Sequence, residues 1–173
     1  MFVEKLIKKA KFLIFDFDGT IANTSPLHES AFQKIFKPFK ISIDYYEIAG
    51  KSTKEAICYI LNKNNLNLKP LEVNHLIHKK QALVREEIKY SKSFKSIPYA
   101  IDFIKKAYQF FPLAIASSGS RKTIELALKR LDLIDYFSYI LCSEDVEKAK
   151  PSPEIFLKTI NLANFKREET LIF

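Results

Sequence analysis

The stretch Phe12-Leu13-Ile14-Phe15-Asp16-Phe17-Asp18-Gly19-Thr20 decides the fold of this chain. Its four leading apolar residues are typical of a buried strand, and the polar residues after them mark an abrupt strand end. Side chains two positions apart on an extended segment face the same way, so we expect Asp16 and Asp18 to project together. Gly19 lets the backbone bend sharply. Paired carboxylates at a strand's carboxyl end suit phosphate and Mg²⁺ chemistry, although Asp and Gly are also common in an ordinary strand-to-turn exit.

Further apolar runs predict the rest of a sheet. Strands are expected at 112–117, 139–142 and 170–173, and the segments between them have helical patterns. Strands that alternate with helices favour an α/β fold with a parallel sheet. Within that sheet we expect the strand at 12–16 to lie between those at 112–117 and 170–173.

The gap between the first two strands is about 95 residues long, far beyond an ordinary crossover of a dozen or more residues. This gap contains signals for the starts of helices. Ser25-Pro26 opens one helix, Ser52-Thr53-Lys54-Glu55 is a capping box, and Pro70 starts a long helical segment. The sequence therefore predicts two domains. Residues 1–22 and 96–173 form the α/β core, and residues 23–95 form an inserted helical domain.

The core segments carry their own helix signals. Pro98, Ser120 and Ser152-Pro153 each open a predicted helix. The segment before Lys11 is expected to form one amphipathic turn or helix, and its charges are too frequent for a secretory signal.

Composition limits the classes of function. With 47% hydrophobic and 28% charged residues and no long apolar run, the chain is expected to be a globular protein that does not enter a membrane.

Cys58 and Cys142 fall in helical and strand patterns, so we expect free thiols and a reducing, cytoplasmic setting. The net charge of +8 comes from scattered lysines without a nucleic-acid-binding motif, which favours an anionic small molecule over nucleic acid as partner. The oligomeric state cannot be predicted.

Three motifs occur in a telling order. They are Asp16-Phe17-Asp18-Gly19-Thr20, Ser117 after the second strand, and Lys150 within Lys150-Pro151-Ser152-Pro153-Glu154-Ile155-Phe156. In this order they resemble the haloacid dehalogenase-like superfamily of phosphohydrolases, and most closely the branch of phosphoglycolate phosphatases and β-phosphoglucomutases. The resemblance covers nearly the whole chain. It implies a Rossmann-like parallel sheet core with an inserted helical cap, and Mg²⁺-dependent hydrolysis of a small phosphorylated metabolite.

The resemblance also implies roles for individual residues. Asp16 would attack the phosphorus and form an aspartyl-phosphate, while Asp18 would act as acid and then as base. Mg²⁺ would bind the Asp16 carboxylate and the backbone carbonyl of Asp18. Ser117 would donate a hydrogen bond to the phosphoryl group, and Lys150 would neutralise its charge. Ser118 and Gly119 are added as substrate-binding candidates.

Candidates in the expected cap rest on weaker matches. Thr24 and His28 correspond to positions near the active site of the resembled branch, and they lie one helical turn apart. Gly50 and Lys51 resemble its substrate-specificity loop, and Lys80 is a further candidate. For His28 the simpler alternative is a surface histidine. For Gly50 and Lys51 it is a plain turn before a capped helix. His75 and His78 are spaced i, i+3, but without further ligands nearby they are expected to be surface residues rather than a metal site.

The family's fourth motif supplies acidic residues that complete the Mg²⁺ site just after a further strand. In this sequence Thr170-Leu171-Ile172-Phe173 begins that strand, and the acids would follow beyond Phe173. We therefore expect a truncated form with weak Mg²⁺ binding and little activity. Alternatives are a β-phosphoglucomutase-like mutase, against which Thr53 and Gly119 argue mildly, and a catalytically impaired protein that binds phosphorylated metabolites. A dehalogenase and a phosphoacceptor receiver domain fit the Asp-x-Asp motif less well.

Overall fold

A computed structural model describes residues 9–173, so the amphipathic turn or helix expected before Lys11 falls almost wholly outside the described residues. The described part of the core contains strands β1 (Phe12–Phe15), β2 (Leu113–Ala116), β3 (Tyr139–Leu141) and β4 (Thr170–Ile172). All pair in parallel, in the order β3-β2-β1-β4. This order confirms the prediction that the first strand lies between the second and the last.

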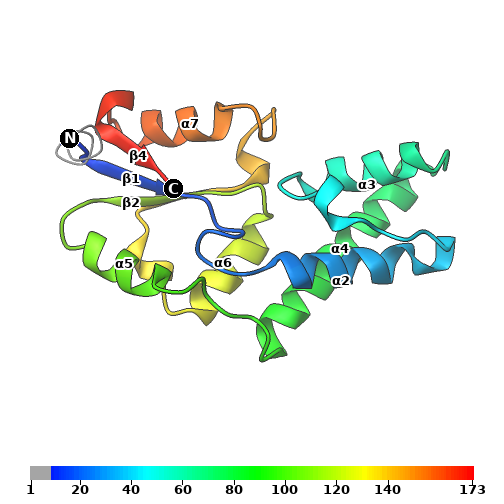
Figure 1. Ribbon diagram of the computed structural model, residues 1–173. Coiled ribbons are helices and arrows are strands. Elements are labelled where there is room, and N and C mark those ends of the chain that lie inside the picture. The colour runs from blue at the N-terminus through cyan, green and yellow to red at the C-terminus, as the bar shows by residue number, and fades with distance from the viewer. Residues whose placement is uncertain (1–8) are drawn as a thin grey trace.

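Side chains alternate between the two faces of this sheet, and each face has its own apolar cover. Leu13 and Phe15 of β1 pack in one cluster with residues of α5 (Ala100–Ala107) and α6 (Arg121–Arg130). Phe12 and Ile14 face the other way and pack with residues of α7 (Glu154–Leu162). Figure 1 shows α7 on one side of the strands and α5 and α6 on the other. The result is a three-layer α/β arrangement of the Rossmann type.

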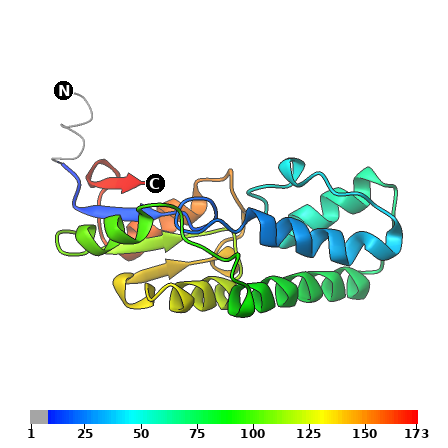
Figure 2. The same ribbon diagram turned by 60° about the horizontal axis from the view of Figure 1, so that its bottom comes forward.

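Residues 23–95, here called the helical insertion, contribute no strand to the described sheet. They contain α2 (Ser25–Phe36), α3 (Thr53–Lys63) and α4 (Pro70–Tyr90), with the short 3₁₀ turns Lys37–Phe39 and Tyr45–Glu47. Their apolar faces meet in a cluster of their own, which includes Phe32, Ile57 and Leu76. The insertion lies beyond the carboxyl ends of the strands (Figure 2). Its status as a separate domain with these bounds remains a proposal.

The helix starts differ from prediction by one or two residues. Thr24 rather than Ser25 occupies the N-cap of α2, and its side chain makes no capping hydrogen bond; its hydroxyl donates to Asp18. The Ser52–Glu55 capping box of α3 is present as predicted, and α4 begins at Pro70. In the core, α5 begins at Ala100 and α7 at Glu154, each just after the proline expected to open it.

Two linkers join the insertion to the core, and they run side by side. Ala22 and Ser96 form an isolated antiparallel bridge, the Asn23 amide donates to the Lys95 carbonyl, and the Ile97 amide donates to the Ile21 carbonyl. A second connection is apolar. Val84 and Ile88 of α4 belong to the same buried cluster as Ile124 and Leu128 of α6. The insertion is therefore fixed to the core both by its linkers and by the far end of α4.

Candidate active site

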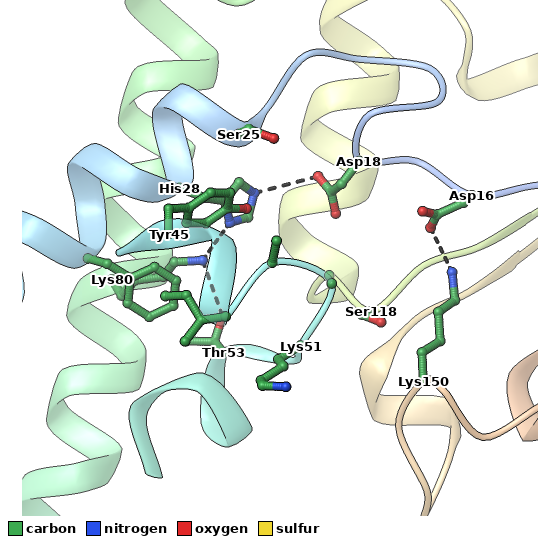
Figure 3. Close-up of a pocket in the computed structure, with 15 residues that line it drawn as sticks. Asp16, Asp18, Ser25, His28, Tyr45, Lys51, Thr53, Lys80, Ser118 and Lys150 are labelled. Atoms are coloured by element: carbon green, nitrogen blue, oxygen red, sulfur yellow. Dashed lines mark hydrogen bonds and ion pairs between the residues drawn. The ribbon is translucent and has the colours of Figure 1, made fainter. Parts of the chain in front are cut away.

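The loop after β1 positions both aspartates. Phe17 is buried and anchors the loop, while its carbonyl accepts hydrogen bonds from the amides of Ile21 and Ala22. Gly19 has a φ of +81°, a left-handed conformation that glycine adopts without the strain of a side chain. Asp16 and Asp18 line one pocket, as expected, but their carboxylates bind different partners (Figure 3).

Asp16 pairs with Lys150, from the loop before α7. The Lys150 Nζ donates to Asp16 Oδ1 at 2.8 Å and to the Ala116 carbonyl at 2.9 Å, and it lies 4.8 Å from the centre of the Phe156 ring. Burial raises the pKa of Asp16 above its ordinary value, and the charge of Lys150 opposes this rise. The ion pair joins the ends of β1 and β2 to the loop before α7.

Asp18 faces the insertion. Thr24 Oγ1 donates to Asp18 Oδ1 at 2.6 Å, and His28 Nε2 lies 3.5 Å from the same oxygen. Burial by itself would raise the pKa of Asp18, but the contacts with His28 and Thr24 outweigh it and lower the pKa to about 2. Asp18 is therefore ionised at neutral pH in this arrangement.

Lys80 is buried behind His28, although its weak sequence match gave it the least support among the candidates. Its Nζ lies 2.6 Å from His28 Nδ1, 3.4 Å from Thr53 Oγ1 and 4.5 Å from the centre of the Phe32 ring. Burial lowers the pKa of Lys80 to about 8, while the charge of Asp18 acts in the opposite direction. One feature of the sequence indicates that Lys80 is buried. Lys80 falls on the four-residue stripe of α4 whose other buried members are Leu76, Val84 and Ile88.

The contact between Lys80 and His28 assigns the tautomer of the histidine. Below pH 8 the Lys80 ammonium can only donate a hydrogen bond, so His28 Nδ1 accepts it. The ring hydrogen then resides on Nε2, which faces Asp18. Lys80, His28 and Asp18 form a continuous polar chain from α4 through α2 to the loop after β1.

The loop after β2 carries Ser117, Ser118 and Gly119. Ser117 is fully buried, and its Oγ accepts a hydrogen bond from the Gly119 amide at 3.0 Å. A Cβ atom on Gly119 would lie 2.8 Å from the terminal methyl group of Ile124, so a larger residue here would require that side chain to shift. Ser118 and Gly119 line the pocket, whereas Ser117 lies behind its wall. The Ser118 Oγ is buried and has no hydrogen-bond partner among residues 9–173.

The pocket has a volume of about 150 Å³. Of the residues predicted from the sequence, nine line it: Asp16, Asp18, His28, Gly50, Lys51, Lys80, Ser118, Gly119 and Lys150. Thr24 is buried behind the wall and reaches the site only through Asp18. The prediction missed Phe32 and Tyr45, which also line the pocket. Burial, together with the charge of Asp18, raises the pKa of the Tyr45 phenol to about 12, so it stays protonated.

The donors present fit a hard divalent cation in kind but are few. Asp16 keeps one carboxylate oxygen that makes no hydrogen bond with the described residues, and oxygen is the ligand atom that Mg²⁺ prefers. The Asp18 carboxylate contacts Thr24 and His28 through Oδ1, so its Oδ2 and its backbone carbonyl are further oxygen atoms that make no hydrogen bond with the described residues. Residues 9–173 contain no group of three or more His, Cys, Asp or Glu side chains placed to hold a metal. His75 and His78 are exposed on α4.

Other predicted features of composition can be checked in the same residues. Cys58 and Cys142 are both free thiols, and Cys142 is buried. Burial raises the pKa of the Cys142 thiol to about 12, which makes it inert as a nucleophile. Among residues 9–173, none of the helices combines the length and the apolar character that crossing a membrane requires.

Comparisons with known proteins place this site in context. A model of the haloacid dehalogenase-like hydrolases matches residues 13–173. A phosphorylated carbohydrates phosphatase of Thermotoga maritima is 28% identical, over 93% of this chain and 74% of the relative. Pyrophosphatase PpaX of Halalkalibacterium halodurans is 29% identical, over 92% of this chain and 72% of the relative. The crystal structure of CbbY from Rhodobacter sphaeroides in complex with phosphate has a TM-score of 0.84 at 22% identity, over 94% of this chain and 76% of that one.

Proposed function

The chain belongs to the haloacid dehalogenase-like hydrolase family, and from this premise we propose that it hydrolyses phosphate monoesters of small metabolites through an aspartyl-phosphate intermediate. The similarity to phosphatases of carbohydrates and of pyrophosphate supports hydrolysis of a phosphorylated small molecule. The observation that carries the proposal is that the two aspartate carboxylates have different hydrogen-bond partners. One is paired with an ammonium group, and the other is held by hydrogen-bond donors.

Asp16 is the proposed nucleophile. Its carboxylate oxygen forms a bond to phosphorus as the bond between phosphorus and the leaving oxygen breaks, and water later releases inorganic phosphate and restores the carboxylate. Attack by one anion on another requires nearby positive charge. Lys150 contacts Asp16 directly, and Lys51 and Lys80 line the same pocket.

Asp18 is the proposed acid and base. As a carboxylate it can accept the proton of the attacking water in the second step. In the first step it must carry the proton that the leaving oxygen takes. A phosphoryl group bound beside Asp18 raises the pKa of this carboxyl, because a second negative charge disfavours its ionised form. Substrate binding and protonation of Asp18 are thereby linked.

The remaining polar groups hold the substrate in place. Ser118 and Gly119 line the pocket next to Asp16, and we assign Ser117 to the support of this loop through its contact with the Gly119 amide. The helical insertion acts as a cap that contributes His28, Lys51 and Lys80 to the pocket. Mg²⁺ would be held by the Asp16 carboxylate and the Asp18 backbone carbonyl, and would neutralise phosphate charge when bound.

The test is hydrolysis of p-nitrophenyl phosphate over a range of Mg²⁺ concentrations. We expect turnover that keeps rising through the millimolar range, because a cation held by few protein ligands binds weakly. Excess EDTA should reduce turnover to the background rate, and added Mg²⁺ should restore it. Turnover that is unaffected by EDTA, or absent at every Mg²⁺ concentration, would overturn the proposal.

A further inference from the structure

Lys150 lies on a loop that contains neither helix nor strand. The loop, residues 146–153, leads into the start of α7. One hydrogen bond joins two main-chain groups of this described segment, from the Ser152 amide to the Ala149 carbonyl. Backbone amides that find no main-chain partner need side chains or water, so the path of such a loop depends strongly on side-chain contacts. The position of Lys150 therefore depends on the groups that hold this loop.

The side chain of Glu154 binds the loop from the first residue of α7. The Glu147 amide donates a hydrogen bond to Glu154 Oε1 at 2.9 Å, and the Lys148 amide donates one to Glu154 Oε2 at 3.0 Å. Hydrogen bonds to an ionised acceptor are about twice as strong as those between neutral groups. Each carboxylate oxygen thus binds one of two consecutive amides, which fixes both the position and the direction of the chain at this point.

The Glu154 carboxylate is ionised at neutral pH. The two amide hydrogen bonds lower its pKa below the ordinary value, and Lys158, one turn further along α7, lowers it further. Lys158 Nζ lies 3.3 Å from Glu154 Oε1 and donates to the Asp145 carbonyl at 3.0 Å. A negative charge in the first turn of a helix also interacts favourably with the helix dipole. These contacts all favour the charged form, which accepts both amides.

The segment that Glu154 closes also carries Lys150. Its hydrogen bond with the Lys148 amide joins the two ends of residues 148–154, and Lys150 lies within this short loop. From there Lys150 Nζ reaches Asp16 Oδ1 at 2.8 Å (Figure 3). Glu154 itself is not among the residues that line the pocket. It can therefore act on the nucleophile only through the position of the loop.

We propose that Glu154 is a positioning residue, whose carboxylate fixes the loop so that Lys150 stays within hydrogen-bond distance of Asp16. The inference rests on the proposed phosphatase function, in which Lys150 neutralises charge beside the nucleophile. Replacement of Glu154 by alanine releases the amides of Glu147 and Lys148, and the loop loses the contacts that set its path. Misplacement of a reacting group by about 1 Å can cost about 10²-fold in turnover.

Kinetics of Glu154→Ala with p-nitrophenyl phosphate and Mg²⁺ test the proposal. We expect kcat to fall about 10–100-fold while KM stays within about threefold, because the charge of Lys150 acts mainly in the transition state. Two controls should keep kcat within about threefold. Lys158→Met removes the neighbouring ion pair but leaves both amide hydrogen bonds, and Glu72→Ala removes a carboxylate–amide hydrogen bond at the start of α4. A loss in either control as large as that in Glu154→Ala would overturn the inference.

A double variant separates positioning from a general loss of stability. Lys150→Met removes the group that Glu154 is proposed to place, so the addition of Glu154→Ala should lower kcat by less than about threefold more. A substitution that only destabilises the fold lowers turnover by the same factor whether or not Lys150 is present. Equal factors in the two backgrounds would contradict the proposal.

A crystal structure of Glu154→Ala tests the positioning without any assay of activity. We expect Lys150 Nζ to lie more than about 3.5 Å from Asp16 Oδ1, beyond hydrogen-bond distance, instead of at 2.8 Å. An ion pair that keeps its length in the variant would refute the role of Glu154. Absence of p-nitrophenyl phosphate turnover by the unmodified chain would instead refute the proposed function, and the structure of the variant would still decide whether Glu154 positions Lys150.

Discussion

The two aspartates of the loop after β1 are two residues apart, but different parts of the molecule surround them. Among the described residues, the Asp16 carboxylate is bound by Lys150, and both residues belong to the α/β core. The Asp18 carboxylate is bound by Thr24 and His28, and Lys80 lies behind His28, so its side-chain partners among the described residues come from the helical insertion. Burial dominates at Asp16 and raises its pKa, whereas contacts dominate at Asp18 and lower its pKa.

On the proposed mechanism, this contrast would let one short motif serve two chemical tasks. A nucleophile needs a charge partner that stays in place, and the core supplies it from the loop before α7. On the same proposal, the group that takes up and releases protons is Asp18, and its hydrogen-bond partners Thr24 and His28 come from the insertion. Substitutions on each side of the pocket should therefore have different consequences.

The largest effect is expected from removal of the nucleophile on the core side. Asp16→Asn should reduce phosphatase turnover to the background rate, a loss of about 10⁴-fold or more, because the amide cannot form the phosphorylated intermediate. Steady-state assays with p-nitrophenyl phosphate measure this loss. Asp135→Asn, an exposed change far from the pocket, is the matched control. Turnover by Asp16→Asn within tenfold of the unmodified chain would rule out Asp16 as nucleophile.

A smaller effect is expected from Lys150→Met, which removes the cation of the core side. Loss of one such electrostatic partner typically costs about 10²–10³-fold in turnover. It should also raise the pKa of Asp16 further, because the charge and the hydrogen bond of Lys150 no longer oppose burial, so the acidic limb of the pH–rate profile should move to higher pH. A profile recorded from pH 4 to 9 decides this. An unchanged acidic limb would show that Lys150 does not set the ionisation of Asp16.

On the insertion side, replacing Lys80 by methionine should increase the stability of the folded chain at neutral pH. Lys80 is buried, with a pKa of about 8 in the folded chain against an ordinary value of 10.5. Between these values the unfolded chain binds a proton that the folded chain does not. The free energy of unfolding should therefore rise with pH across this window, by about 3 kcal/mol at most.

Lys80→Met should lack this rise and should be more stable than the unmodified chain at pH 7. Denaturant unfolding at pH 7, 8, 9 and 10 measures the difference, with the exposed Lys129→Met as control. A difference between Lys80→Met and the unmodified chain that stays constant across these pH values would contradict the prediction.

The sequence predicts the elements of the core well because each depends on local pattern. Apolar runs of four residues mark β1 and β2, and a polar cluster ends each of them. The capping box at Ser52 is equally local, since its two hydrogen bonds join residues three apart. The predicted position of β1 between β2 and β4 is also confirmed.

What escaped prediction depends on contacts between distant parts of the chain. Thr24 leaves its helix N-terminus uncapped because its backbone is in the helical region, with φ −98° and ψ −12°, rather than the extended conformation usual at an N-cap, and its hydroxyl donates to Asp18 outside the helix. Tyr45 reaches the pocket through a 3₁₀ turn that no periodic pattern marks. Lys80 is detectable only by asking why a charged residue falls on an apolar stripe, and its partners His28 and Phe32 are about 50 residues away in sequence.

The bridge between Ala22 and Ser96 also bears on how quickly this chain can fold. Leu13 of β1 must find Leu113 of β2, a search across a loop of about 100 residues. If the insertion folds first and brings Ala22 to Ser96, the loop that remains is about a quarter as long. Two halvings of loop length lower the entropy cost of closure by about 1.2 kcal/mol, close to a tenfold gain in rate. An insertion that folds first would therefore speed the pairing of β1 with β2, because it shortens the loop that this pairing must close.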